Sequence, residues 1–96
     1  MRVIVWTRRA VDDVQSIRNF ISQDSPTYAD LVVQRIISAV ERLVEFPGSG
    51  RLVPEFEQSD LREVIHSPYR IVYRLRNNEV HVLTVHHSAR ILRLES

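Results

Sequence analysis

The sequence predicts an α+β fold: an N-terminal strand, an antiparallel helical hairpin, and then a three-stranded antiparallel meander. Between residues 10 and 44, apolar residues recur at three- and four-residue intervals, which is the period of an amphipathic helix. Three later stretches, near 61–66, 69–76 and 79–87, are rich in valine, isoleucine and tyrosine and have the length of strands. We therefore expect two helices on one face of a mainly antiparallel sheet, in a single domain over residues 1–96.

The N-terminal half indicates one short strand and two helices. Residues 3–6 form an apolar run, and Thr7 is a suitable N-cap for a helix that extends to about Ser22. Asp24-Ser25-Pro26 ends that helix and starts another, because serine is a favoured N-cap and proline a favoured first helical residue. Pro47-Gly48 ends the second helix. Because the connector between the two helices, at Asp24-Ser25-Pro26, is so short, we expect the helices to pack side by side in antiparallel orientation.

The C-terminal meander follows a predicted loop over residues 47–60. Asn77-Asn78 reads as a two-residue turn, since asparagine tolerates a positive φ. Such a turn pairs Arg76 with Glu79, Arg74 with His81, Val72 with Leu83 and Arg70 with Val85. Alternation then gives one basic face, made of Arg70, Arg74, Arg76, His81 and His87. The face packed on the helices would carry Tyr69, Ile71, Tyr73, Leu75, Val80, Val82, Thr84 and His86.

Two features of this register stay open. The predicted pairing places His87 with the arginines and His86 on the core side, but a bulge near Thr84 would exchange the two. The first hairpin turns at His66-Ser67-Pro68-Tyr69. A three-residue turn there places Arg62 beside the basic face, whereas a two-residue turn places it, with Val64 and His66, on the core side.

Charge is unevenly divided along a chain whose net charge is +1. Residues 61–96 carry six arginines and three acidic residues, whereas residues 1–60 carry seven arginines and nine acidic residues. A basic, imidazole-bearing sheet has two interpretations: it meets an anionic partner at one face, or it is an ordinary solvated sheet face. There is no lysine, which excludes a lysine general base, and no cysteine. We expect a cytoplasmic protein, because the N-terminus lacks a signal peptide and no apolar run could span a membrane.

The residue types narrow the chemistry further. A strand cannot aim both rings of His86-His87 at one ion, so no metal site is expected, and two glycines are too few for a phosphate-binding loop. No cofactor is therefore expected. The predicted surface for a partner or target comprises Arg51, Arg62, Arg70, Arg74, Arg76, His81 and His87. Arg51 has two interpretations: it reaches a ligand, or it caps the carbonyls at the end of the second helix.

Several motifs resemble the RelE/ParE superfamily of type II toxin–antitoxin toxins, and the resemblance covers nearly the whole chain. The order and spacing of the motifs carry it, since each one alone is weak. In this sequence they read Thr7-x-x-Ala10-x-x-Asp13-Val14, Asp24-Ser25-Pro26, Pro47-x-x-Gly50-Arg51, Leu61-Arg62-Glu63, Tyr69-Arg70-Ile71-Val72-Tyr73 and Val85-x-His87-x-x-Arg90.

The resemblance implies a growth-arresting toxin held inactive by a cognate antitoxin that wraps its surface. The ParE branch of the superfamily blocks DNA gyrase, whereas the RelE branch cleaves messenger RNA in the ribosomal A site. The absence of lysine, and Glu63 where the RelE pattern has a basic residue, favour the ParE branch. In the RelE interpretation, Arg70, His87 and Arg90 would be the catalytic groups of a metal-independent endoribonuclease. Acidic residues of the antitoxin would be expected to meet Arg70, Arg74 or Arg76.

Overall fold

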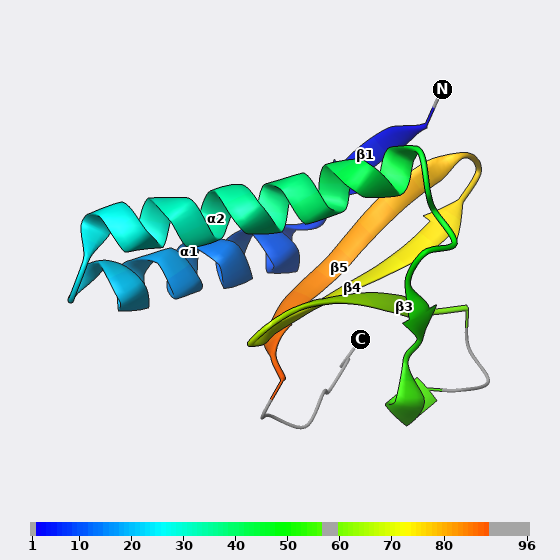
Figure 1. The fold of residues 1–96 in the computed structure, drawn as a ribbon. Coiled ribbons are helices and arrows are strands. Elements are labelled where there is room, and N and C mark those ends of the chain that lie inside the picture. Colours follow the sequence, from blue (N-terminus) through cyan, green and yellow to red (C-terminus); the bar gives the residue numbers. More distant parts are fainter. Residues whose placement is uncertain (1, 57–59, 89–96) are drawn as a thin grey trace.

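A computed structural model describes residues 2–56 and 60–88 (Figure 1). Its helical part consists of α1 (Arg8–Ser22), α2 (Pro26–Glu41) and a short 3-10 helix, η1 (Arg42–Val44), that extends α2. Its strands are β1 (Val3–Trp6), β2 (Arg51–Leu52), β3 (Arg62–His66), β4 (Tyr69–Arg76) and β5 (Glu79–His87), with a second 3-10 helix, η2 (Pro54–Phe56), after β2. The predicted α+β class and element order are confirmed. No helix among these residues is long and apolar enough to cross a membrane.

The helices begin where their capping residues predict. The Thr7 hydroxyl accepts a hydrogen bond from the Ala10 amide at 3.2 Å, and it also donates to the Val82 carbonyl at 2.8 Å. The second bond fixes the start of α1 against β5. Ser25 caps α2 by accepting from the Tyr28 amide at 3.1 Å. Both caps satisfy amides that a helix N-terminus leaves without partners.

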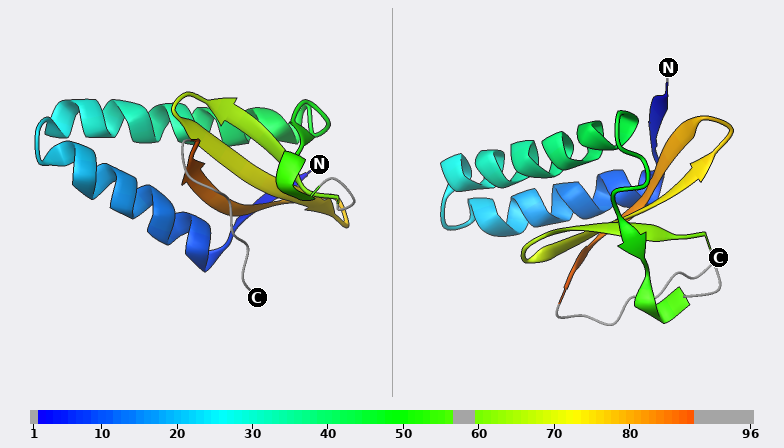
Figure 2. Two further views of the ribbon diagram at one scale, coloured as in Figure 1. Left: turned by 90° about the horizontal axis from the view of Figure 1, so that it is seen from below. Right: turned by 45° about the vertical axis from the view of Figure 1, so that its right-hand side comes forward.

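The five strands lie in the order β1-β5-β4-β3-β2, and β1 runs parallel to β5 while the other pairs are antiparallel. The helical hairpin covers one face of the sheet (Figure 2). The apolar core between the helices and the sheet includes Ile36, Ile71 and Val82. On the opposite face the chain from β2 to β3 packs Val53 and Leu61 against β4. The sequence predicted only a loop here. Its two-residue strand is too short to show an alternating pattern.

Both predicted turns can now be assigned. Asn77 and Asn78 have φ values of 48° and 65°, which confirms the two-residue turn and the Arg76–Glu79 and Arg74–His81 pairs. The first hairpin also has a two-residue turn, because His66 pairs with Tyr69. Arg62, Val64 and His66 consequently belong to the helix-covered face.

The pairs Val72–Leu83 and Arg70–Val85 are wrong, because β5 contains a bulge. Tyr73 pairs with Val82, but the next residue of β4, Val72, pairs with Thr84, and Arg70 therefore lies opposite His86. One extra residue in a strand reverses the facing of everything beyond it. His86 thus shares the face of Arg70, and His87 lies opposite Tyr69. The regular register predicted the reverse, and the exchange of the two histidines is the one that a bulge near Thr84 was expected to cause.

The loop between η1 and β2 approaches β4 closely, and this contact sets the path of the chain. The Tyr73 hydroxyl, in the core, accepts from the Gly50 amide at 3.0 Å and donates to the Pro47 carbonyl at 2.7 Å. Burial raises the pKa of this phenol, so it remains a hydrogen-bond donor at neutral pH. A Cβ on Gly50 would lie 2.6 Å from the Tyr73 hydroxyl and 2.7 Å from the Glu63 carbonyl.

Gly50→Ala should therefore lower the free energy of unfolding by about 1–3 kcal/mol through overpacking. Gly48→Ala is the matched control, because a Cβ on Gly48 meets nothing within 4 Å. Urea denaturation of both variants checks this expectation. Equal denaturation midpoints would show that the Gly50 turn can move away from Tyr73 at little cost.

Candidate functional site

The centre of the predicted basic face is a buried network of charges. Arg70 is 6% exposed and Glu63 1% exposed. The Glu63 carboxylate accepts from Arg70 Nε and from Arg51 Nε, both at 2.7 Å. The outer nitrogens of Arg70 bind Glu55 in a bidentate manner at 2.7 and 2.8 Å. The hydrogen bonds to Glu55, followed by those to Glu63, raise the pKa of Arg70, which stays charged at all working pH values.

This network is a structural clasp, which we call the Glu63 clasp (Arg51, Glu55, Glu63 and Arg70). Its members come from β2, η2, β3 and β4, so it joins the short outer segment to the sheet. Burying a carboxylate is costly unless it is paired and hydrogen-bonded, and here both oxygens of Glu63 are occupied. Arg51 binds Glu63 and caps no helix among the described residues. Arg70, expected on an exposed face, has its guanidinium engaged by two carboxylates.

Two more residues of the predicted face contact acidic side chains. Arg74 Nε lies 2.9 Å from Asp60, and the His81 ring lies 3.0 Å from Glu79. Arg62 donates to the Gly50 carbonyl at 2.8 Å. Arg76 is exposed at the end of β4. Three of the five arginines predicted to bind a partner, Arg51, Arg70 and Arg74, are therefore paired with acidic groups of the same chain.

The bulge in β5 is fixed by one carboxylate of α1. Asp13 Oδ2 accepts from the Val85 amide at 3.1 Å and from the Thr84 hydroxyl. The residue of β5 that the pairing with β4 skips is Leu83, two positions before Val85. The pairing of β1 with β5 ends at Trp6 and Val82, and beyond that point Asp13 supplies the acceptor for the Val85 amide. Thr84 is buried, as expected, but its contact is with a charged side chain rather than with the apolar core.

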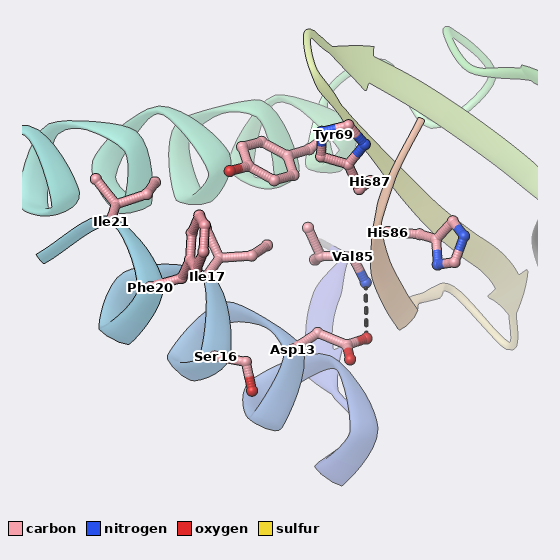
Figure 3. Close-up of a pocket in the computed structure, with 9 residues that line it drawn as sticks. All are labelled: Asp13, Ser16, Ile17, Phe20, Ile21, Tyr69, Val85, His86 and His87. Carbon is pink, nitrogen blue, oxygen red and sulfur yellow. Dashed lines mark hydrogen bonds between the residues drawn. The ribbon is translucent and has the colours of Figure 1, made fainter. Parts of the chain in front are cut away.

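The two histidines end β5 beside a pocket of about 450 Å³ between α1 and the sheet. Figure 3 shows the His87 ring next to Tyr69 and the His86 ring on the other side of the strand. The Tyr69 and His87 rings meet edge to face, with centroids 5.8 Å apart. Apolar residues of α1 form the opposite wall, and Phe20 is 71% exposed there. Burial, and then the nearby Tyr28, raise the pKa of Tyr69, so its phenol is a donor rather than a base.

The structure does not bring the expected catalytic groups together. Arg70 lies in the Glu63 clasp on the sheet face away from the helices, whereas His87 lies beside Tyr69 near α1. Arg90 lies outside the described residues. Within residues 2–56 and 60–88 there is no group of three histidine or acidic side chains that could hold a metal ion.

Two residues that shape this region were missed from the sequence. Asp13 was noted only as part of a motif, and nothing near it in the chain points to β5, 71 residues away. The role of Glu63 could have been suspected from the sequence, since Glu63 occupies a strand position on the same face as Arg70. A charged residue there indicates a buried partner, but which partner depends on the hairpin turn.

Comparisons with known proteins agree over nearly the full length of the chain. Residues 4–92 match the family described as the ParE toxin of the type II toxin–antitoxin system parDE. Toxin RelE2 of Caulobacter vibrioides is 38% identical over 92 residues, which cover 95% of this chain and all of that toxin. The fold is also similar to a solved chain of the chromosomal ParDE toxin–antitoxin system from P. aeruginosa, with a TM-score of 0.74 and 26% identity. That match covers 91% of this chain and 96% of the solved one.

Removing Arg70 should unfold much of the outer layer, by which we mean β2 and η2. Arg70→Ala leaves the Glu63 carboxylate without its principal partner, so the free energy of unfolding should fall by about 3–5 kcal/mol. Arg76→Ala, at an exposed arginine of the same strand, should change it by less than about 0.5 kcal/mol. Arg70→Met combined with Glu63→Leu should recover part of the loss, because no buried charge remains unpaired. Equal stability of the two single variants in urea would contradict the clasp.

Adjacent aspartates of α1 allow a matched test of the bulge. Asp13→Ala leaves the Thr84 hydroxyl and the Val85 amide without their acceptor, which should cost about 1–3 kcal/mol. Asp12→Ala removes only an exposed pair with Arg8 and should cost less than about 0.5 kcal/mol. Thermal denaturation compares the variants, and the NMR signals of the His87 ring should shift only in Asp13→Ala. Unchanged His87 signals in that variant would show that Asp13 does not fix the bulge.

Proposed function

The chain belongs to the ParE toxin family of type II toxin–antitoxin systems, and we propose that its target is DNA gyrase and that a cognate antitoxin neutralises it. The family match, which runs from β1 to beyond β5, confirms the superfamily resemblance seen in the sequence motifs. Growth arrest then follows from blocked supercoiling in the cytoplasm, where gyrase acts. Gyrase inhibition by a small protein requires a binding surface rather than an assembled catalytic centre.

The observation that carries this proposal is the engagement of Arg70. A nuclease arginine must reach the phosphate on which charge develops, and its donors must face that position. The Nε and both outer nitrogens of Arg70 instead bind Glu63 and Glu55, and the side chain is buried. Freeing it would leave the buried Glu63 carboxylate paired, among the described residues, with the largely exposed Arg51 alone. His87, on the other face, cannot act on the same phosphate as Arg70.

A RelE-like, ribosome-dependent endoribonuclease is the second candidate. It is favoured by the 38% identity to a toxin named RelE2 over that toxin's whole length. The Tyr69–His87 pair beside α1 would then have to supply the proton transfers, since the two rings are in contact and lie near an open pocket.

Two assays on the purified toxin separate the candidates. Supercoiling of relaxed plasmid by gyrase should be inhibited, or cleaved DNA should accumulate, whereas messenger RNA on translating ribosomes should stay intact. Relaxation of the same plasmid by topoisomerase I is the control and should be unaffected. Premixing the toxin with its antitoxin should restore supercoiling. Codon-positioned cuts in the A site, with supercoiling normal, would instead establish the second candidate.

A further inference from the structure

Two exposed arginines of the helical layer have no side-chain partner among the residues that the structure describes. Among residues 2–56 and 60–88, neither Arg35 nor Arg42 makes an ion pair or a side-chain hydrogen bond, unlike Arg51, Arg70 and Arg74 of the sheet. They are seven residues apart, which places them on one side of α2 and η1 about 10 Å from each other. The sequence pointed to the sheet for anion binding. The structure also leaves two positive charges exposed on α2 and η1.

Both arginines border one depression between α2 and β3. The small side chains of Ser38 and Ala39 lie between them, and Val64 and His66 form the opposite wall. A second depression shares Arg35 and His66 with the first and continues around the β3–β4 turn to Tyr28. That turn lies below the helical hairpin in Figure 1.

Together the two depressions form one groove, which we call the α2 groove and define by Tyr28, Val32, Arg35, Arg42, Val64 and His66. Its two ends differ in character. Arg35 and Arg42 make one end cationic. The other end is apolar, with Val32 at its base and Tyr28 52% exposed at its rim. A surface of this kind complements a segment with acidic residues at one end and apolar residues at the other.

We propose that the α2 groove binds an acidic, amphipathic segment of the cognate antitoxin; this inference rests on the proposed function. Acidic side chains of that segment pair with Arg35 and Arg42, and its apolar side chains cover Tyr28 and Val32. A nucleic acid fits less well, because its phosphates are negative along their whole length whereas only one end of the groove is cationic. Arg51, Arg70 and Arg74 of the sheet fit less well too, because binding there would compete with Glu63, Glu55 and Asp60.

The test compares charge reversals on the helix and on the sheet. Arg35→Glu combined with Arg42→Glu should weaken binding of purified antitoxin by at least about tenfold and reduce the salt dependence of association. Arg76→Glu, at an exposed arginine of β4, is the control and should change the affinity less than about twofold. Tyr28→Ala should weaken binding without altering the salt dependence. Circular dichroism melts verify that each variant is folded, and Arg35→Ala with Arg42→Ala replaces the reversal if it is not.

Induction in cells distinguishes this inference from the proposed function. The double reversal should still arrest growth when produced alone, but the antitoxin should no longer rescue those cells. Unchanged antitoxin affinity in the folded variant overturns the α2 groove as the docking site. So does loss of growth arrest with antitoxin binding intact, which would assign the groove to the toxin's target. Wild-type protein that binds antitoxin through the groove but neither arrests growth nor inhibits gyrase would refute the proposed function alone.

Discussion

A single buried carboxylate holds the outer layer of this protein against its sheet. Glu63 lies between Arg51 and Arg70, and Arg70 in turn holds Glu55, so four consecutive elements from β2 to β4 depend on one another. The β2 strand contributes only two residues to the sheet, too few to be stable by pairing alone. The cost of leaving Glu63 unpaired is what keeps this short segment in place, and with it the apolar cluster of Val53 and Leu61.

The clasp also changes how the surface charge should be interpreted. Arginines on one strand face look like an anion-binding surface, but these arginines neutralise acidic groups of their own chain. Charge that is already paired attracts an external partner weakly, because a new contact must replace an existing one. Stability and recognition consequently rely on different arginines. Arg51 and Arg70 serve the fold, whereas Arg35 on α2 and Arg42 on η1 remain available to a partner.

Asp13 has a comparable influence on the other side of the sheet. By binding the bulge in β5 it fixes which of two adjacent histidines faces the helices. His87 thereby joins Tyr69 at the pocket beside α1, and His86 joins the opposite face. The chemistry offered by the end of β5 is therefore set by a helix near the other end of the chain. The sequence of the strand alone does not predict which histidine faces the helices.

The sequence by itself determined the features that depend on neighbouring residues. Thr7 and Ser25 cap helices because a side chain and the amide three residues later are always close, and Asn77-Asn78 turns because asparagine accepts a positive φ. Apolar periodicity likewise identified both helices and the inward face of β4. Only the tertiary structure decided the bulge, the face of His87 and the burial of Arg70. Each of these depends on a carboxylate brought close by folding, and an alternating pattern read along one strand cannot show which distant charge will satisfy it.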